Sequence, residues 1–238
     1  AENLSALVPE KEKNGALGAW LTRKLSDGVL SNIIFTTGLD FRRNVETRQW
    51  DTLVNKPKMT FDFKNMTVKY NSTLKAVKRS NGSGVYEDDA LKIQGNVGYV
   101  GDVVGKNIKL KITNLSKAGG GMADINLDAS GPLKSALDYV SDDPISLKQS
   151  DLGFDIKNVK GDVNFNLQLN FPTLKDLPKE RVKVKLKGKA NNLLLPNVVR
   201  GLSLTGGPYD LGFKDGAITL KGKGKLSSYD IDLDWLQY

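Results

Sequence analysis

Two neighbouring stretches of this sequence, 163–171 and 181–190, alternate position by position between apolar and polar residues. The polar positions hold Asn or Gln in the first stretch and Arg or Lys in the second. A β-strand directs successive side chains to opposite faces, so this period of two predicts two strands, each with an apolar and a polar face. The predicted apolar face consists of Val163, Phe165, Leu167, Leu169, Phe171, Val182, Val184 and Leu186.

Such a face cannot be left in contact with water. Five apolar side chains on one strand gain roughly 7–15 kcal/mol when they are fully removed from water. The net stability of a typical domain is only about 5–15 kcal/mol. Something must therefore cover the apolar face, and the identity of that cover is the functional question that the sequence raises.

The formal net charge of +8 suggests a nucleic acid or an anionic membrane as partner. The position of the cations argues against the first, because Arg181 and the lysines up to Lys189 fill the polar face of a predicted strand. Phe165 and Phe171 lie on the opposite, apolar face, whereas a surface that stacks on bases needs aromatic residues among its cations. We therefore expect no nucleic-acid partner and lysines that face solvent.

The rest of the chain also has mostly strand character. Residues 1–13 are predicted to be a tail or linker, followed by one elongated β domain over 14–238. Helical spacing of apolar residues predicts short helices near 14–26 and 132–141, while 42–57 (with Trp50) is predicted to be an irregular connection and 80–84 a turn. The other predicted strands are 29–41, 59–70 with a bulge near 64–65, 84–86, 91–99, 103–113, 122–129, 193–195, 202–204, 209–213, 217–225 and 229–235.

These segments define the predicted fold class as mainly β. Two short helices cannot cover the apolar faces of so many strands, so the sheet must close, fold over itself or leave a channel for a ligand. A weak internal sequence similarity relates the segments 61–66, 154–159 and 211–216. If it reflects a repeat, the domain would divide into two repeats near 131–150. A repeated hairpin and a shared β composition are both open as its cause.

Catalytic chemistry is poorly represented in this sequence. The chain has no His and no Cys, which removes the commonest general base, nucleophile activator and metal ligands. The segment 101–106 differs from a phosphate-binding loop in length and in the strand that follows it. The acidic runs 87–89 and 142–143 fall in predicted turns, where Asp is common. We predict no catalytic residue, no metal site and no cofactor.

Several segments together resemble the central module of the YhdP-like proteins in the AsmA-like superfamily. They begin with Trp20-Leu21, Leu25, Gly28 and Phe35, which are similar to the family's opening helix and strand. The family's helix of the form "a.Gpl..lL.yl" is similar to the segment 129–139. The remaining segments that carry the resemblance are 63–70, 84–86, 91–93, 161–172 and 215–235.

The resemblance implies a long, curved antiparallel sheet folded over an apolar groove, like a taco or an open barrel. It implies a non-enzymatic segment of a larger protein in the periplasm of a Gram-negative bacterium, tethered to the inner membrane through a segment not in this chain. There it would shield the acyl chains of phospholipid, or of another acyl lipid, between the inner and outer membranes. The expected partners are such a lipid, the membrane through missing flanking segments, and other envelope proteins.

Two alternatives from other classes remain open at this stage. The first is a closed β-sandwich or barrel that serves as a scaffold or protein-interaction module, with apolar faces that pack only on each other. The second is an enzyme acting on envelope polysaccharide, which would need a carboxylate pair in a cleft. The sequence offers such pairs only in predicted turns.

Overall fold

The computed structural model describes residues 25–69, 75–116, 120–141, 154–174, 177–214 and 216–237. These residues form twelve strands, one α-helix and two short 3-10 helices. The strands are β1 (Leu25–Ser26), β2 (Val29–Arg43), β3 (Trp50–Val68), β4 (Val77–Glu87), β5 (Ala90–Val100), β6 (Val103–Thr113), β7 (Met122–Pro132), β8 (Lys160–Pro172), β9 (Lys183–Val199), β10 (Leu202–Lys214), β11 (Ala217–Leu226) and β12 (Tyr229–Gln237).

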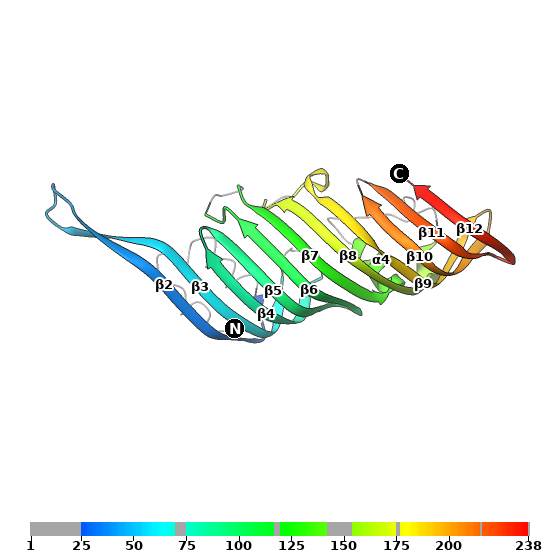
Figure 1. The fold of residues 1–238 in the computed structure, drawn as a ribbon, viewed down its shortest axis with the longest axis horizontal. Helices are drawn as coiled ribbons and strands as arrows, with labels where there is room; N and C mark the ends of the chain where they lie inside the picture. Colours follow the sequence, from blue (N-terminus) through cyan, green and yellow to red (C-terminus); the bar gives the residue numbers. More distant parts are fainter. Residues whose placement is uncertain are drawn as a thin grey trace.

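All twelve strands belong to one antiparallel sheet. From β3 to β12 the order in space is the order in sequence, and β1 and β2 both pair with β3. Figure 1 shows the strands side by side, oblique to the long axis of an elongated molecule, with β2 and β12 at opposite ends. The mainly β, antiparallel fold predicted from the alternation is confirmed, and the sheet is open rather than closed into a barrel.

The α-helix of the described residues is α4 (Leu133–Ser141), which confirms the helix predicted near 132–141. Its Leu137 is buried in a cluster with Val159 and Val163, where the 3-10 helix η1 (Ile156–Asn158) leads into β8. The second 3-10 helix, η2 (Lys179–Arg181), precedes β9.

The helix predicted near 14–26 lies mostly outside the described residues, and its last two positions are wrong. Leu25 and Ser26 form β1, which pairs with Val68 and Thr67 at the end of β3. Leu25 is buried with Phe61, Phe63, Met66 and Leu91. Sheet pairing and burial decide these positions, and neither is visible in the local helical spacing.

The irregular connection predicted for 42–57 is also wrong. Arg43 pairs with Trp50, and β2 and β3 continue as one long hairpin from there into the sheet. The period of two is hidden because the register shifts near Thr36 and Gly38, and Lys56 takes a left-handed backbone with φ of 48°. A bulge of this kind adds a residue to one strand and inverts the apparent alternation.

The turn predicted at 80–84 lies instead within β4. Its glycines are explained by packing, since a Cβ at Gly84 would lie 2.7 Å from Phe61 Cε1 and one at Gly82 would lie 2.7 Å from Phe63 Cζ. Each ring covers the glycine of the next strand. Tyr209 covers Gly224 in the same way, with 2.7 Å from its Cζ to a Cβ built there.

Bulges recur along the sheet, usually at a residue in the left-handed region. The bulge predicted near 64–65 is confirmed by a register shift between Phe63 and Met66 and by φ of 55° at Asn65. Bulges increase strand twist and bend the sheet. Other left-handed residues at register shifts are Asn32, Arg79, Asn107 and Asn192.

The packing of Phe61 on Gly84 makes a stability prediction. Gly84→Ala forces the ring to move and should lower the free energy of unfolding by about 1–3 kcal/mol. Gly105→Ala is the matched control, because a Cβ at that strand glycine meets no atom closer than 3.6 Å. Chemical denaturation should show little loss in the control, and equal losses in both variants would contradict the packing explanation.

Candidate functional site

The strand register shows how the predicted apolar residues lie relative to one another. Leu167 of β8 pairs with Leu127 of β7 and Leu186 of β9. Leu169 pairs with Ile125 and Val184 in the same way. Directly paired residues of an antiparallel ladder lie on the same side of the sheet. The predicted residues of β8 and β9 therefore share one face, and Val182 lies just before β9.

The same register extends the apolar surface over most of the sheet. We call this surface the apolar face. One row of paired residues crosses it from β5 to β9, and another crosses it from β7 to β11. The first row is Ile93, Leu110, Ile125, Leu169 and Val184, and the second is Leu127, Leu167, Leu186, Phe213 and Ile218.

Two hydrophobic clusters cover parts of the apolar face with protein. The first contains Phe61, Phe63 and Leu91 around β3 to β5. The second gathers α4 and the following η1 against β8 to β12, and in it Val163 is only 1% exposed. Val163 was predicted to line an open groove together with the other seven residues, but its side chain is packed against protein.

The middle of the apolar face is less enclosed. Leu167, Leu169, Phe171, Val184 and Leu186 are half-buried. Within the ranges given above, no α-helix other than α4 is present to lie over them, and α4 packs near Val163. These half-buried side chains form a strip of aliphatic and aromatic surface between the two clusters that the described part of the chain covers only in part.

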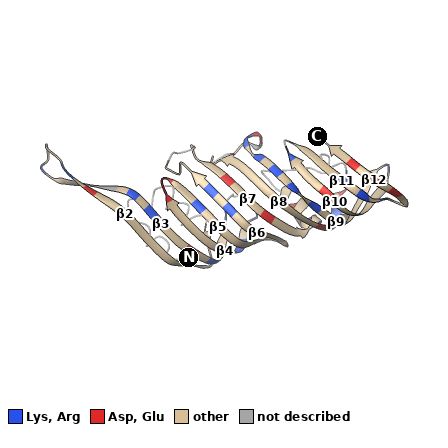
Figure 2. Ribbon diagram, viewed as in Figure 1, with Lys and Arg blue, Asp and Glu red and all other residues tan. Residues whose placement is uncertain are grey.

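The opposite side of the sheet, the polar face, carries the charge. Lys183, Lys185, Lys187 and Lys189 are all exposed there. Lys189 forms an ion pair with Asp210 at 3.4 Å across the strands, and two further strand pairs are Lys221–Asp234 at 2.9 Å and Lys225–Asp230 at 3.5 Å. Figure 2 shows blue and red positions spread along the strands, so the charge is not gathered at one end.

An amide network ties the polar face together around Asp128. Asn107 donates to Asp128 Oδ2 at 2.8 Å and Asn166 donates to Asp128 Oδ1 at 3.0 Å. These hydrogen bonds, that of Asn107 first, hold the pKa of Asp128 below its usual value. The amides thus stabilise the ionised carboxylate.

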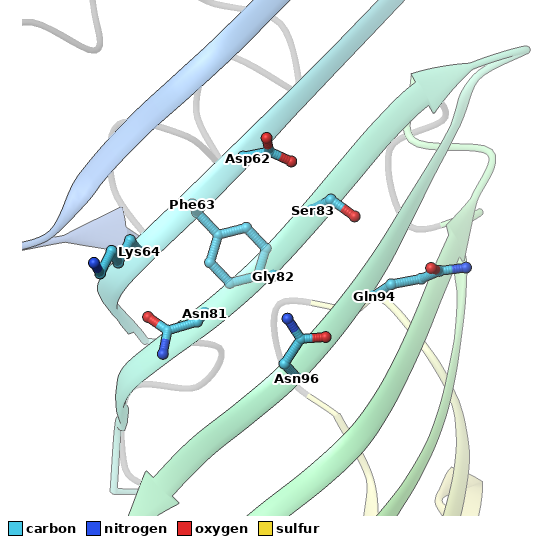
Figure 3. Close-up of a pocket in the computed structure, with 8 residues that line it drawn as sticks. All are labelled: Asp62, Phe63, Lys64, Asn81, Gly82, Ser83, Gln94 and Asn96. Atoms are coloured by element: carbon cyan, nitrogen blue, oxygen red, sulfur yellow. The ribbon is translucent and has the colours of Figure 1, made fainter.

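Two shallow hollows lie on this side of the sheet, and the sequence did not predict them. The hollow in Figure 3 has a volume of about 470 Å³, and the other, of about 530 Å³, shares Gln94 and Asn96 with it. Amide side chains at the bulges, such as Asn81 and Asn107, line them. In the sequence, Asn residues inside predicted strands, where Asn is uncommon, are the feature that could have indicated these bulges. The first hollow is lined by Asp62, Phe63, Lys64, Asn81, Gly82, Ser83, Gln94 and Asn96.

Glu87 and Asp89, two of the acidic residues considered as catalytic candidates, contact nearby side chains and backbone. Glu87 binds Lys92 at 2.9 Å and Lys58 at 3.1 Å, and these two lysines lower the pKa of its carboxyl group. Asp89 accepts hydrogen bonds from the backbone N–H and the hydroxyl of Ser116. Asp142 and Asp143 lie outside the described residues. Where the structure describes the chain, no group of three or more potential metal ligands occurs.

An open sheet with one apolar and one polar face places the chain among amphipathic one-sheet β proteins. A family model described as YhdP protein matches residues 3–235, so the chain belongs to the YhdP family. It is an envelope protein of the AsmA-like type, as the sequence resemblance predicted. Comparison with curated proteins and with solved structures gave no match. Among the described segments, no helix is both long and apolar enough to cross a membrane.

The exposed lysines of β9 should be dispensable for folding. Replacing Lys183, Lys185, Lys187 and Lys189 together by Gln should change the free energy of unfolding by no more than about 1 kcal/mol, because exposed ion pairs contribute little. The same variant should bind anionic vesicles more weakly at low salt. A large loss of stability would show that these side chains are not on a solvated face.

The amide network makes a prediction about pH. Asn166→Ala removes a donor and should raise the pKa of Asp128 toward its usual value, as followed by NMR titration. Because the folded-state pKa is depressed, the stability that Asp128 contributes is present above its unfolded pKa and is lost as the pH falls through the folded one. Gln168→Ala is the control, since Gln168 donates to Asn166 rather than to Asp128, and should leave the titration unchanged.

Proposed function

We propose that the open middle of the apolar face holds the acyl chains of phospholipid or of a similar acyl lipid. The strip around Leu167, Leu169 and Phe171 carries this proposal, because it is apolar, half-buried and continuous with rows that cross many strands. Acyl chains are the ligand class that such a strip can take without hydrogen bonds or charges. In this role the chain is a non-enzymatic segment of a lipid-transport protein.

The open strip is about as wide as one acyl chain is long. The four strands from β6 to β9 carry its half-buried row from Leu110 to Val184 and span about 14 Å at the usual strand spacing. A single layer of acyl chains in a bilayer is about 15 Å thick, half of the hydrocarbon core. An acyl chain could therefore lie across the strip, shielded from water as transfer between the inner and outer membranes across the periplasm requires.

The open sheet also bears on the main alternative. A closed barrel or a two-sheet sandwich would cover its apolar faces with its own strands. Here β2 and β12 lie at opposite ends, and the described strands all belong to one sheet. This topology favours a groove for a ligand over a scaffold closed on itself.

Native mass spectrometry of the purified 238-residue chain is the direct experiment. We expect phospholipid to co-purify and to dissociate only on activation in the gas phase. A chain that is folded by circular dichroism but carries no lipid, even after incubation with phospholipid, would contradict the proposal.

A charge introduced at the centre of the strip can distinguish a strip covered by lipid from one covered by protein. Leu167→Asp should fold, since a half-buried carboxylate in an empty groove stays near water, while acyl chains are repelled and bound lipid falls at least about tenfold. If protein covered Leu167, the same carboxylate would be desolvated at a cost of several kcal/mol and the domain would unfold. Gln168→Asp is the matched control, because it adds the same charge to the neighbouring position on the polar face and should keep its lipid.

A further inference from the structure

The hairpin formed by β2 and β3 extends well beyond the rest of the sheet (Figure 1). β4 pairs with β3 only from Met59 onward, whereas β2 and β3 stay paired as far as Arg43 and Trp50. We call residues 38–55 the tip hairpin. Every residue of β2 from Ser31 to Arg43 is exposed.

The apolar face of the sheet continues onto this hairpin. Phe35 pairs with Met59, which pairs with Tyr86 of β4. Leu39 and Phe41 follow Phe35 on the same parity of β2. Exposure rises steadily along this path, from 3% at Phe61 in the sheet to 49% at Phe35, 51% at Leu39, 62% at Phe41 and 66% at Trp50.

The other side of the tip hairpin carries Asp40, Arg42 and Asn55, and Asn55 donates a side-chain hydrogen bond to Asp40. The tip hairpin is thus an amphipathic two-stranded ribbon, a structure that is only marginally stable in water by itself. A contiguous exposed apolar surface of this kind usually marks a contact with another surface.

Addition of a partner strand to the edge of the hairpin fits poorly. The register shifts near Asn32 and near Lys56, where both residues have left-handed backbones, flank the tip hairpin, whose paired segments are only 38–43 and 50–55. Short edges flanked by bulges are poor templates for strand pairing. A highly charged partner fits no better, because the three arginines of residues 38–55 are balanced by two Asp and one Glu.

We propose that the tip hairpin inserts its apolar side into the interface of a phospholipid bilayer. Phe41 and Trp50 would lie at the boundary between headgroups and acyl chains, where aromatic residues are favoured. Val45, 91% exposed in the connecting turn, would enter furthest. Arg43, paired with Trp50, would reach lipid phosphates with its guanidinium while its aliphatic stem stays in the interface.

This proposal goes beyond the lipid-holding role and does not depend on it, because the contact is made outside the strip around Leu167. Because the tip hairpin has no net charge, its binding to a membrane should depend little on the lipid charge or on the salt concentration. Binding should survive on zwitterionic phosphatidylcholine vesicles in about 0.5 M salt, where the Debye length is only about 4 Å and attraction of the lysine-rich polar face to the membrane is screened.

The experiment compares two double variants of the 238-residue chain in vesicle co-sedimentation under those conditions. Phe41→Ser with Trp50→Ser should weaken partitioning at least about tenfold, because two large side chains no longer enter the interface. Tyr229→Ser with Leu236→Ser is the matched control, since these residues are 69% and 52% exposed at the opposite end of the sheet. Both variants should keep the thermal unfolding of the unmodified chain.

Fluorescence reports on the contact itself. In a chain with Trp20→Phe and Trp235→Phe, Trp50 is the remaining tryptophan, and vesicles should shift its emission to the blue and protect it from quenching by iodide.

Absence of vesicle binding at high salt, or equal binding by both double variants, would overturn the proposal. A self-association that the Phe41/Trp50 variant abolishes, with no vesicle binding, would also overturn it in favour of a second copy. If the hairpin proposal failed in one of these ways but native mass spectra still showed bound lipid, the proposed lipid-holding function would be unaffected.

Discussion

The alternation of apolar and polar residues along each strand determines how this molecule folds. Each strand alone has one side that is unstable in water, and the antiparallel register aligns these sides into rows such as Leu127, Leu167 and Leu186. A single open sheet can bury only part of that surface with its own side chains. Here two hydrophobic clusters, around β3 to β5 and over β8 to β12, cover parts of the apolar face, and the half-buried strip between them gives the YhdP-family chain the surface on which its proposed function depends.

Curvature and close packing come from a few local features that interrupt the alternation. Asn65 and Asn107 take left-handed backbones at bulges, which bend the strands, and Asn107 also lines one of the hollows on the polar face. Glycines such as Gly84 leave room for an aromatic ring from the next strand. In the sequence these bulges and glycines look like the ends of strands. In the structure the strands continue through them.

The two ends of the sheet differ in what they expose. The β2–β3 hairpin carries the apolar face outward as a narrow ribbon, with Phe41 and Trp50 at its far end. At the other end β12 pairs with β11 along its length, and its Trp235 packs edge-on against Phe154. We therefore propose two separate contact surfaces, the open strip for single acyl chains and the hairpin for an assembled membrane interface.

The sequence by itself determined the strand periodicity, the helix α4, the polar side of β9 and the apolar residues of β8 and β9, because each depends on residues close together in the chain. Only the tertiary structure decided that Val163 is covered by protein while Leu167 is half-open, since this depends on where α4 packs. It also decided that Trp50 is part of a strand and that Gly82 and Gly84 are not in a turn. Those outcomes depend on partners in neighbouring strands, which local composition does not encode.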